Sequence, residues 1–171
     1  MKNRIELARY FNQLGLKVGG EIGVSGGINA ENLCKNIEGL KLYCIDSWEG
    51  SRGENALKKS RERLSQYNVI FIKKTSMDAV KDFKDESLDF VFIDANHKFD
   101  FVMQDIIEWS KKVRSGGVVS GHDYYHSPSA RIGVIEAVDA YVKAHNVSLN
   151  LTTKDPDSAD DKEPSFWWIK T

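Results

Sequence analysis

The sequence EIGVSGGINAENL, at residues 21–33, gives the first indication of how this chain of 171 residues folds. An apolar strand from about Val18 to Val24 leads into a turn rich in glycine, and a helical pattern follows from about Asn29 to Asn36. Glycines leave out side chains, so a ligand can approach the backbone N–H groups at the start of the helix. The stretch therefore predicts the beginning of an open α/β sheet with a ligand at the turn.

Downstream of this turn, strands and helices alternate along the chain. The strands are continuous apolar runs, which is typical of a parallel sheet that helices cover on both faces. The last connection, KDPDSADDKEP at residues 154–164, has no helical pattern, so the final two strands should pair antiparallel as a hairpin. One domain should cover residues 1–171. The expected strands lie at about 18–24, 40–46, 69–74, 88–94, 116–123, 147–153 and 165–171, and the expected helices include 5–14, 54–67 and 131–145.

Charge and cysteine content narrow the class of partner. The formal net charge of −1 leaves no general basic field, so we expect a small polar metabolite rather than nucleic acid or a membrane. Cys34 and Cys44 fall in a helix and a strand, as buried free thiols of a cytoplasmic protein would, and we expect no disulfide. Residues 1–15 fit neither a signal peptide nor a membrane span.

A carboxylate at the end of the second strand points to a nucleoside-containing ligand. Asp46 follows the glycine turn by about 20 residues, where a carboxylate commonly accepts hydrogen bonds from a ribose diol. The glycine spacing differs from the dinucleotide fingerprint, because Ser25 stands at the middle glycine position between Gly23 and Gly27. Glu21 lies in the strand itself, where it must either meet a donor or cation or cap neighbouring amides.

Two later strands also end on polar residues. Asp94 ends the strand at 88–94 with His97 three residues on, and His122 and Asp123 end the strand at 116–123. Two carboxylates and an imidazole at one edge could hold a divalent ion, or they could only orient cofactor and substrate. His97 could act as a general base near neutral pH, or it could be a backbone-bonded residue at the start of a helix.

These stretches resemble a known family. EIGVSGG resembles the first motif of class I S-adenosylmethionine-dependent methyltransferases, which is an acidic residue, any residue, Gly, three residues and Gly. YCIDSWEG, at residues 43–50, resembles their second motif, and residues 87–125 are similar to the fourth-to-fifth-strand block of small bacterial O-methyltransferases. The resemblance covers about residues 6–170 and implies a Rossmann-like, seven-stranded, mostly parallel sheet with an antiparallel last strand, in three α/β/α layers.

The resemblance also implies roles for individual residues in binding S-adenosylmethionine. Glu21 would hold the amino end of the methionine part, directly or through water, with Gly23 and Gly27 lining it. Asp46 would take the ribose hydroxyls. The residues at the adenine would be Ser47, Trp48, Ser76 and Met77. An ST-turn, a packed side chain and a core aromatic remain open for Ser76, Met77 and Trp48 respectively. The implied cofactor-binding residues are Glu21, Gly23, Val24, Ser25, Gly27, Asp46, Ser47, Trp48, Ser76, Met77 and Asp94.

A second set of roles follows from the metal-dependent members of that family. The resemblance to the catechol type implies Asp94, His122 and Asp123 as ligands of Mg²⁺ or a similar ion. His122 stands where an acidic or amide ligand is usual, so a softer ion is an alternative. His97 lies where the catechol type carries its lysine base, which implies His97 and Asp94 as the catalytic residues.

The favoured function is methyl transfer to an oxygen of a small hydroxylated metabolite or sugar, with or without a divalent metal. A non-catalytic cofactor-binding module, an NAD-dependent oxidoreductase and an oxygen-dependent or hydrolytic enzyme are the alternatives. The glycine spacing and the lack of a Tyr-x-x-x-Lys pair disfavour the oxidoreductase. Residues 122–133 are expected to form a substrate-facing loop, and a homodimer could complete an otherwise open pocket.

Overall fold

A single sheet organises the computed structural model, which describes residues 1–126, 132–153 and 162–171. Within these residues seven strands follow the order β3-β2-β1-β4-β5-β7-β6. Strands β1 to β5 pair in parallel, while β7 runs antiparallel to both β5 and β6. The strands are β1 Val18–Ile22, β2 Lys41–Asp46, β3 Val69–Lys73, β4 Leu88–Ile93, β5 Val113–Gly121, β6 Asn150–Leu151 and β7 Phe166–Ile169.

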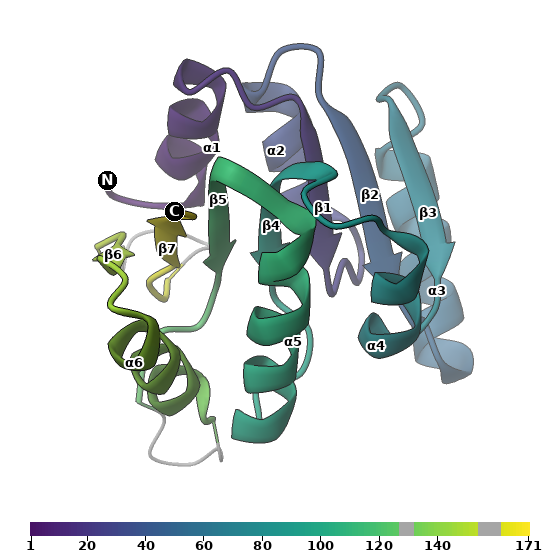
Figure 1. The fold of residues 1–171 in the computed structure, drawn as a ribbon. Helices are drawn as coiled ribbons and strands as arrows, with labels where there is room; N and C mark the ends of the chain where they lie inside the picture. Colours follow the sequence, from purple (N-terminus) through teal and green to yellow (C-terminus); the bar gives the residue numbers. More distant parts are fainter. Residues whose placement is uncertain (127–131, 154–161) are drawn as a thin grey trace.

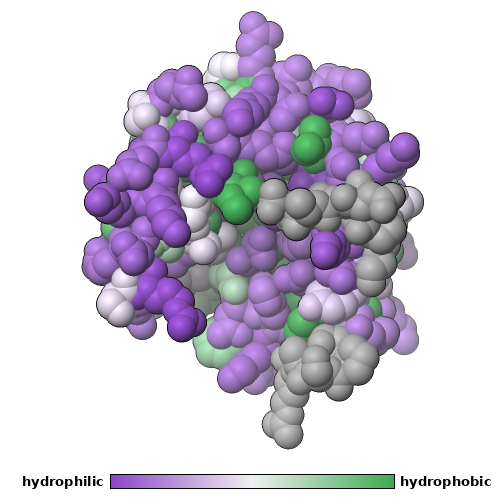
Figure 2. All heavy atoms as spheres, turned by 180° about the vertical axis from the view of Figure 1, so that it is seen from behind, coloured by the Kyte–Doolittle hydropathy of each residue, from purple (hydrophilic) through white to green (hydrophobic). Residues whose placement is uncertain are grey.

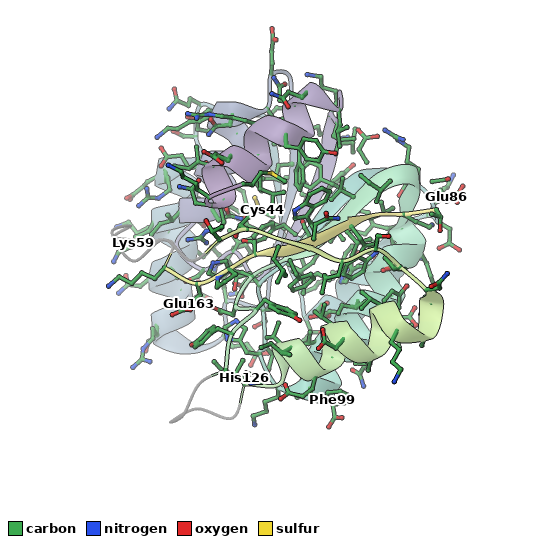
Figure 3. The ribbon with its side chains drawn as sticks, turned by 90° about the vertical axis from the view of Figure 1, so that its left-hand side faces the viewer. Cys44, Lys59, Glu86, Phe99, His126 and Glu163 are labelled. Atoms are coloured by element: carbon green, nitrogen blue, oxygen red, sulfur yellow. The ribbon has the colours of Figure 1, made fainter. Side chains whose placement is uncertain are left out.

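Helices cover both faces of this sheet (Figures 1 and 3). Helices α1, α2 and α3 pack on one face, and α4, α5 and α6 pack on the other. The expected three-layer architecture with an antiparallel last strand is therefore confirmed. The helices are α1 Arg4–Gln13, α2 Ile28–Asn36, α3 Gly50–Arg63, α4 Ser76–Ala79, α5 Phe99–Lys112 and α6 Val134–His145, with a 3-10 turn at Val80–Asp82.

The strands contribute to a core on each face because successive side chains point to opposite sides. In β4, Phe90 and Phe92 join the core under α1, α2 and α3, whereas Val91 and Ile93 join the core under α5 and α6. Helix α3 is mostly solvated, with only Leu57 and Ser60 buried. Figure 2 shows this side of the molecule, on which hydrophilic side chains predominate.

The hairpin at the end of the chain forms as expected but is shorter. Only Asn150 and Leu151 of the expected strand at 147–153 are in β6. Beyond them, the backbone N–H of Ser165 donates to the side-chain hydroxyl of Thr152, at 2.9 Å, so a side chain replaces the regular ladder acceptor. The loop inferred at 154–164 lies outside the described residues except for 162–164.

Two further expectations concern cysteines and membranes. Cys34 and Cys44 are free thiols, as the sequence predicts, and burial raises the pKa of Cys34 to about 12. Cys44 lies inside the molecule (Figure 3). Among the described helices, none is both long enough and apolar enough to span a bilayer.

Candidate active site

A cavity of about 870 Å³ opens at the carboxyl edge of the parallel strands. In an open α/β sheet this edge, beside the point where strand order reverses, is where ligands bind. Here β1 lies between β2 and β4, so the strand order reverses beside β1: β2 and β3 lie on one side of it, and β4 and β5 lie on the other. The wall combines the ends of β1, β2 and β4 with the first turns of α4 and α5. It consists of Ile22, Gly23, Ser25, Ile45, Asp46, Ser47, Glu49, Thr75, Ser76, Met77, Asp94, Ala95, Asn96, His97, Phe101, Gln104 and Asp105.

The glycine turn brings backbone to the cavity wall. Gly23 has a φ of +91°, and a Cβ there would lie 2.1 Å from the carbonyl oxygen of Asp94. Only glycine fits, since the turn after β1 lies directly against the end of β4. Ser25, at the middle glycine position, has a φ of +49°. A non-glycine residue persists in this left-handed conformation only when its surroundings hold it, and such residues gather at functional sites.

Asp46 holds the turn in place. One of its carboxylate oxygens, Oδ2, accepts from the backbone N–H groups of Val24 and Ser25, at 3.0 and 2.8 Å. The other oxygen, Oδ1, accepts from the backbone N–H of Trp48 at 2.9 Å. Asp46 also lines the cavity. Its carboxylate therefore shapes the loop itself, and a ribose would be a further partner of a group that already accepts three hydrogen bonds.

The structure places several of the implied cofactor-binding residues away from the wall. Val24 and Trp48 are 4% and 2% exposed and belong to the core, and the Trp48 indole donates to the carbonyl of Ser25 at 3.0 Å. This placement favours the core alternative for Trp48, and its adenine-bordering role stays a prediction. Gly27 packs against α3, because a Cβ there would lie 3.0 Å from Cβ of Ser60. Gly27 thus permits close helix packing rather than ligand approach.

Glu21 is a buried carboxyl on the face of β1 that α2 covers. It is 1% exposed, and its Oε1 accepts from the side-chain amide of Asn29 at 2.9 Å, while its Oε2 is buried with no hydrogen-bond partner. Burial raises the pKa of Glu21 to about 8, against the lowering effects of the Asn29 hydrogen bond and the charge of Arg4. Glu21 is not among the residues of the cavity wall, so its implied role at the methionine end of the cofactor stays a prediction.

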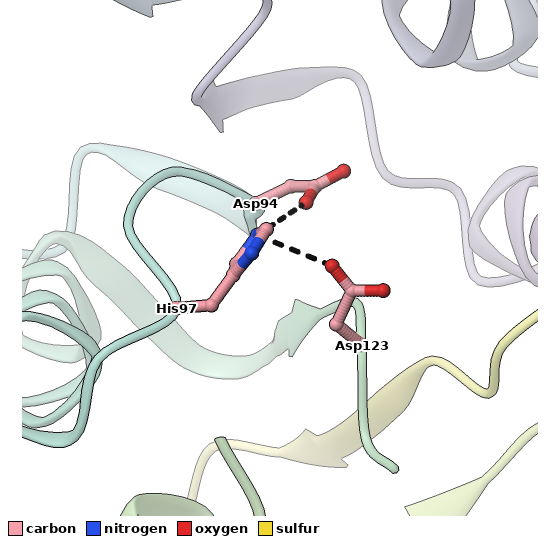
Figure 4. A group of neighbouring side chains, drawn as sticks. All are labelled: Asp94, His97 and Asp123. Carbon is pink, nitrogen blue, oxygen red and sulfur yellow. Dashed lines mark hydrogen bonds and ion pairs between the residues drawn. The ribbon is translucent and has the colours of Figure 1, made fainter. Parts of the chain in front are cut away.

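A second group gathers the polar ends of β4 and β5. The imidazole of His97 lies between two carboxylates, with Nε2 at 3.3 Å from Oδ1 of Asp94 and 3.2 Å from Oδ2 of Asp123 (Figure 4). The hydrogen bond to Asp94 raises the pKa of His97, and burial opposes this. Burial works to raise the pKa of Asp123, but the hydrogen bond from His122 and the neighbouring positive charges lower it overall.

The potential metal ligands differ from those expected. One nitrogen of His97 and one oxygen each of Asp94 and Asp123 lie within 4.8 Å of one another, and among the described residues this is the set that could hold an ion. His122 is not in it, because its Nδ1 lies 3.1 Å from the other oxygen of Asp123. His122 and Asp123 are therefore in contact, but His122 meets Oδ1 of Asp123, whereas His97 meets Oδ2.

Arg4 brings a positive charge from α1 to the same group. Its guanidinium nitrogen lies 3.9 Å from Oδ2 of Asp94, and only 12% of its side chain is exposed. The charge of Arg4 also lowers the pKa of both Glu21 and Asp123. Sequence reasoning missed this residue, since nothing in a helical pattern near the amino terminus indicates which strand ends lie beneath it.

A third polar group lies at the opposite part of the wall, between α4 and α5. The Ser76 hydroxyl donates to Oδ1 of Asp105, and the Trp109 indole donates to the same hydroxyl oxygen at 2.8 Å. Asp105 is 3% exposed, and burial raises its pKa to about 6 although the Ser76 hydrogen bond opposes this. Sequence reasoning missed Asp105. The sequence does contain an indication of its role, because Asp105 is a carboxylate on the same helix face as the apolar residues Val102 and Ile106.

Part of the expected substrate-facing loop can be placed. His122 and Asp123 lie at the end of β5, and the Tyr124 hydroxyl donates to Asp139 of α6 at 2.7 Å. Residues 127–131 of that loop lie outside the described residues. Among the described residues, the loop therefore contributes its first carboxylate to the His97 group rather than a tyrosine to the cavity wall.

Comparison with known proteins gives one family and many solved structures of similar fold. The sequence model of a family described as "Methyltransferase domain" matches residues 20–124. No protein of curated function matches the chain by sequence. The carboxyl edge with its glycine turn, Asp46 and the His97 group falls within the matched residues, apart from Arg4.

Three solved structures illustrate the fold. An O-methyltransferase from Bacillus cereus in complex with S-adenosylhomocysteine has a TM-score of 0.74 at 18% identity, with 98% of this chain and 80% of that chain covered. The O-methyltransferase TomG from Streptomyces achromogenes, in complex with S-adenosylmethionine, has a TM-score of 0.71 at 16% identity, with 98% and 79% covered. An rRNA methylase from Streptococcus thermophilus has a TM-score of 0.71 at 17% identity, with 99% and 98% covered.

Proposed function

This chain belongs to the family of methyltransferase domains, and from that premise we propose that it transfers a methyl group from S-adenosylmethionine to an oxygen of a small hydroxylated metabolite. The observation that carries the proposal is a single cavity that joins the glycine turn and Asp46 to the His97 group. The first part is suited to bind a nucleoside, and the second is suited to accept a proton.

The cofactor side of the cavity consists of preformed backbone. When bound, S-adenosylmethionine supplies a methyl group that its sulfonium already activates, so the protein needs mainly to position the reactants and exclude water. Gly23 and Ser25 present a turn without bulky side chains, and Asp46 fixes that turn through its backbone hydrogen bonds. The cavity wall near this turn is thus rigid before any ligand arrives, which lowers the cost of ordering on binding.

On the acceptor side, His97 takes the proton of the attacking hydroxyl. Its side chain is 37% exposed and lines the cavity, so a substrate oxygen can reach it. Asp94 and Asp123 orient the ring and stabilise the imidazolium that forms when the proton is accepted. The carbon–oxygen bond forms as the carbon–sulfur bond breaks, and His97 receives the hydroxyl proton, so the charges balance within the site.

The residues also fit a divalent ion, and that would change the role of His97. Two carboxylate oxygens and an imidazole nitrogen are a suitable donor set for a first-row transition metal, and the 3.2 and 3.3 Å separations suit adjacent ligands of one ion. An ion would lower the pKa of a bound hydroxyl. Without an ion, the N–H at Nε2 faces the two carboxylates and Nδ1 is the nitrogen that can accept a proton. An ion on Nε2 would leave the single ring proton on Nδ1, so His97 could not be the base of a metal-dependent enzyme.

The names of two structural neighbours support an oxygen acceptor. The Bacillus cereus and Streptomyces achromogenes proteins are named as O-methyltransferases, whereas the Streptococcus thermophilus protein is named as an rRNA methylase. The net charge of −1 favours a small metabolite over RNA, because an RNA-binding surface normally carries a basic patch. The exposed ring of Phe101 at the cavity wall offers a flat apolar surface for such a metabolite.

Transfer of a labelled methyl group tests the proposal. The protein would be incubated with S-adenosyl-[methyl-³H]methionine and pools of catechols, sugars and flavonoids, with rRNA as a separate acceptor, each with Mg²⁺, Mn²⁺ or EDTA. We expect label in a hydroxylated small molecule, and His97→Ala should slow transfer about 10²- to 10⁴-fold while S-adenosylhomocysteine still binds. The exposed His145 at the end of α6 gives the control His145→Ala, which should leave the rate unchanged.

Three outcomes would contradict parts of this proposal. Label in rRNA alone would replace the acceptor class. Full activity of His97→Ala would remove His97 as the base. Activity that disappears with EDTA and returns with one ion would assign His97 to the metal, and the base would then have to be another group.

A further inference from the structure

Asp105 and its two neighbours form a preorganised hydrogen-bond acceptor in the cavity wall. The Ser76 hydroxyl has one proton, and because it accepts from the Trp109 indole it is oriented to donate that proton to Oδ1 of Asp105. Asp105 lies in the middle of α5, and Ser76 is the first residue of α4. The acceptor is therefore fixed by two helices and a buried aromatic ring, and it needs no rearrangement to receive a ligand.

A buried carboxylate in this position requires more than one donor. Burial raises the pKa of Asp105 to about 6, so at neutral pH the group is mostly ionised and can only accept hydrogen bonds. Among the described residues, the one hydrogen bond that Asp105 accepts comes from the neutral hydroxyl of Ser76. A ligand N–H that reaches the carboxylate from the cavity would supply the second donor and offset the cost of burying the charge.

The other carboxylates of the wall are already occupied or solvated. Asp46 accepts from three backbone amides, and Asp94 contacts His97 and Arg4. Glu49 is exposed to solvent. Asp105 is thus the wall carboxylate best able to accept a hydrogen bond from a ligand.

Asp78 follows Ser76 and Met77, two residues that the resemblance implies for cofactor binding, but its carboxylate is engaged outside the cavity wall. It is exposed, its carboxylate accepts from Lys81 at 2.8 Å and from the Thr75 hydroxyl at 2.9 Å, and it is absent from the cavity wall. Ser76 and Met77 of the same segment do line the wall. A carboxylate for this part of the cavity therefore comes from another element, and α5 supplies it.

Building on the proposed methyl-transfer function, we propose that the Asp105 carboxylate accepts a hydrogen bond from the exocyclic amine of the cofactor's adenine. Asp105 is then the residue that makes the site select an adenine over a 6-oxo purine. Ser76 and Trp109 act as positioning residues, since they hold the carboxylate but need not touch the base. The carboxylate disfavours a 6-oxo group because two hydrogen-bond acceptors would then face each other.

Calorimetric titration with two demethylated cofactors tests this role. S-Adenosylhomocysteine carries the 6-amine, and S-inosylhomocysteine carries an oxygen in its place. The wild-type protein should bind the adenosyl compound about 10- to 100-fold more tightly. Asp105→Asn presents an amide that can donate to the 6-oxo group, so this ratio should fall to near one or reverse. Asp100→Asn, the same substitution at an exposed site on the same helix, should leave the ratio unchanged.

Each remaining outcome has a defined meaning. If the wild-type protein binds neither compound, the proposed function fails, whereas an equal ratio in wild type and Asp105→Asn overturns only the role of Asp105. Gln104 also lines the wall, so a ratio that collapses in Gln104→Ala but not in Asp105→Asn would assign the selection to Gln104. If Asp105→Asn does not fold, Ser76→Ala decides: removing the donor to the carboxylate should lower the wild-type ratio, and an unchanged ratio would refute the proposal.

Discussion

Replacing Glu21 by glutamine should change how the stability of the protein depends on pH. Glu21 is 1% exposed, one of its oxygens has no hydrogen-bond partner, and burial raises its pKa from 4.5 to about 8. Glutamine has the same shape and can still accept from Asn29, but it cannot ionise. The substitution therefore removes the titration and preserves the packing.

The sign of the effect follows from where the proton is held. Between pH 4.5 and about 8 the folded protein keeps the Glu21 proton that the unfolded chain has lost. Stability from this group is therefore complete below pH 4.5, falls as pH rises, and is lost above about 8. The slope is about 1.4 kcal/mol per pH unit, and the whole loss is on the order of 5 kcal/mol. Such a loss is large beside the typical 5–15 kcal/mol total for a domain of roughly this size.

Urea unfolding followed by circular dichroism at pH 5, 6, 7 and 8 measures this slope. The free energy of unfolding of Glu21→Gln, relative to wild type, should rise by about 1.4 kcal/mol per unit and reach about 4 kcal/mol at pH 8. Other titrating groups such as Asp105 are present in both proteins, so their contributions cancel in the difference.

A matched substitution on α2 provides the control for this slope. Ion pairs with Lys35 and Arg63 lower the pKa of Glu31 below 4.5, so this group stays ionised across the range. Glu31→Gln should therefore differ from wild type by the same amount at every pH. Parallel curves for wild type and Glu21→Gln would refute the reasoning, because they would mean that Glu21 is ionised in the folded protein at pH 5.

The cavity wall gives two further predictions. Asp46→Asn places an amide donor among three backbone N–H donors. By calorimetry, S-adenosylhomocysteine should bind at least about tenfold more weakly, and by urea titration the free energy of unfolding should fall by about 1–3 kcal/mol. Unchanged affinity would remove Asp46 from the site. Gly23→Ala puts a Cβ 2.1 Å from a backbone oxygen and should cost more than about 2 kcal/mol, whereas Gly26→Ala, with no atom within 4 Å, should stay within about 0.5 kcal/mol. Equal melting temperatures of these two alanine variants would contradict the close packing at Gly23.

Much of the architecture can be predicted from the sequence, because each strand or turn is indicated by residues that are neighbours in the chain. Continuous apolar runs such as Phe90–Ile93 predict buried parallel strands, and the polar loop before Phe166 predicts the final hairpin. The glycine turn is equally local: Gly23 has the positive φ that its place between strand and helix requires. Asp46 and Asp94 follow from the same rule, since every parallel strand of the sheet delivers its last residue to one edge.

The chemistry of the site depends on contacts between distant segments. His97 rather than His122 completes the group with Asp94 and Asp123, because the loop after β4 brings its ring between the two carboxylates, whereas His122 contacts the other oxygen of Asp123. Asp105 meets Ser76 across 29 residues of sequence.

A proton's affinity for a carboxylate depends on the solvent, donors and charges around it, which periodicity in the chain does not encode. The residue pattern by itself therefore determined the sheet, the edge and most of the residues that reach it. Only the packing of α1, α2 and α5 against that sheet decided that Glu21 is buried from solvent and that Arg4 and Asp105 join the site.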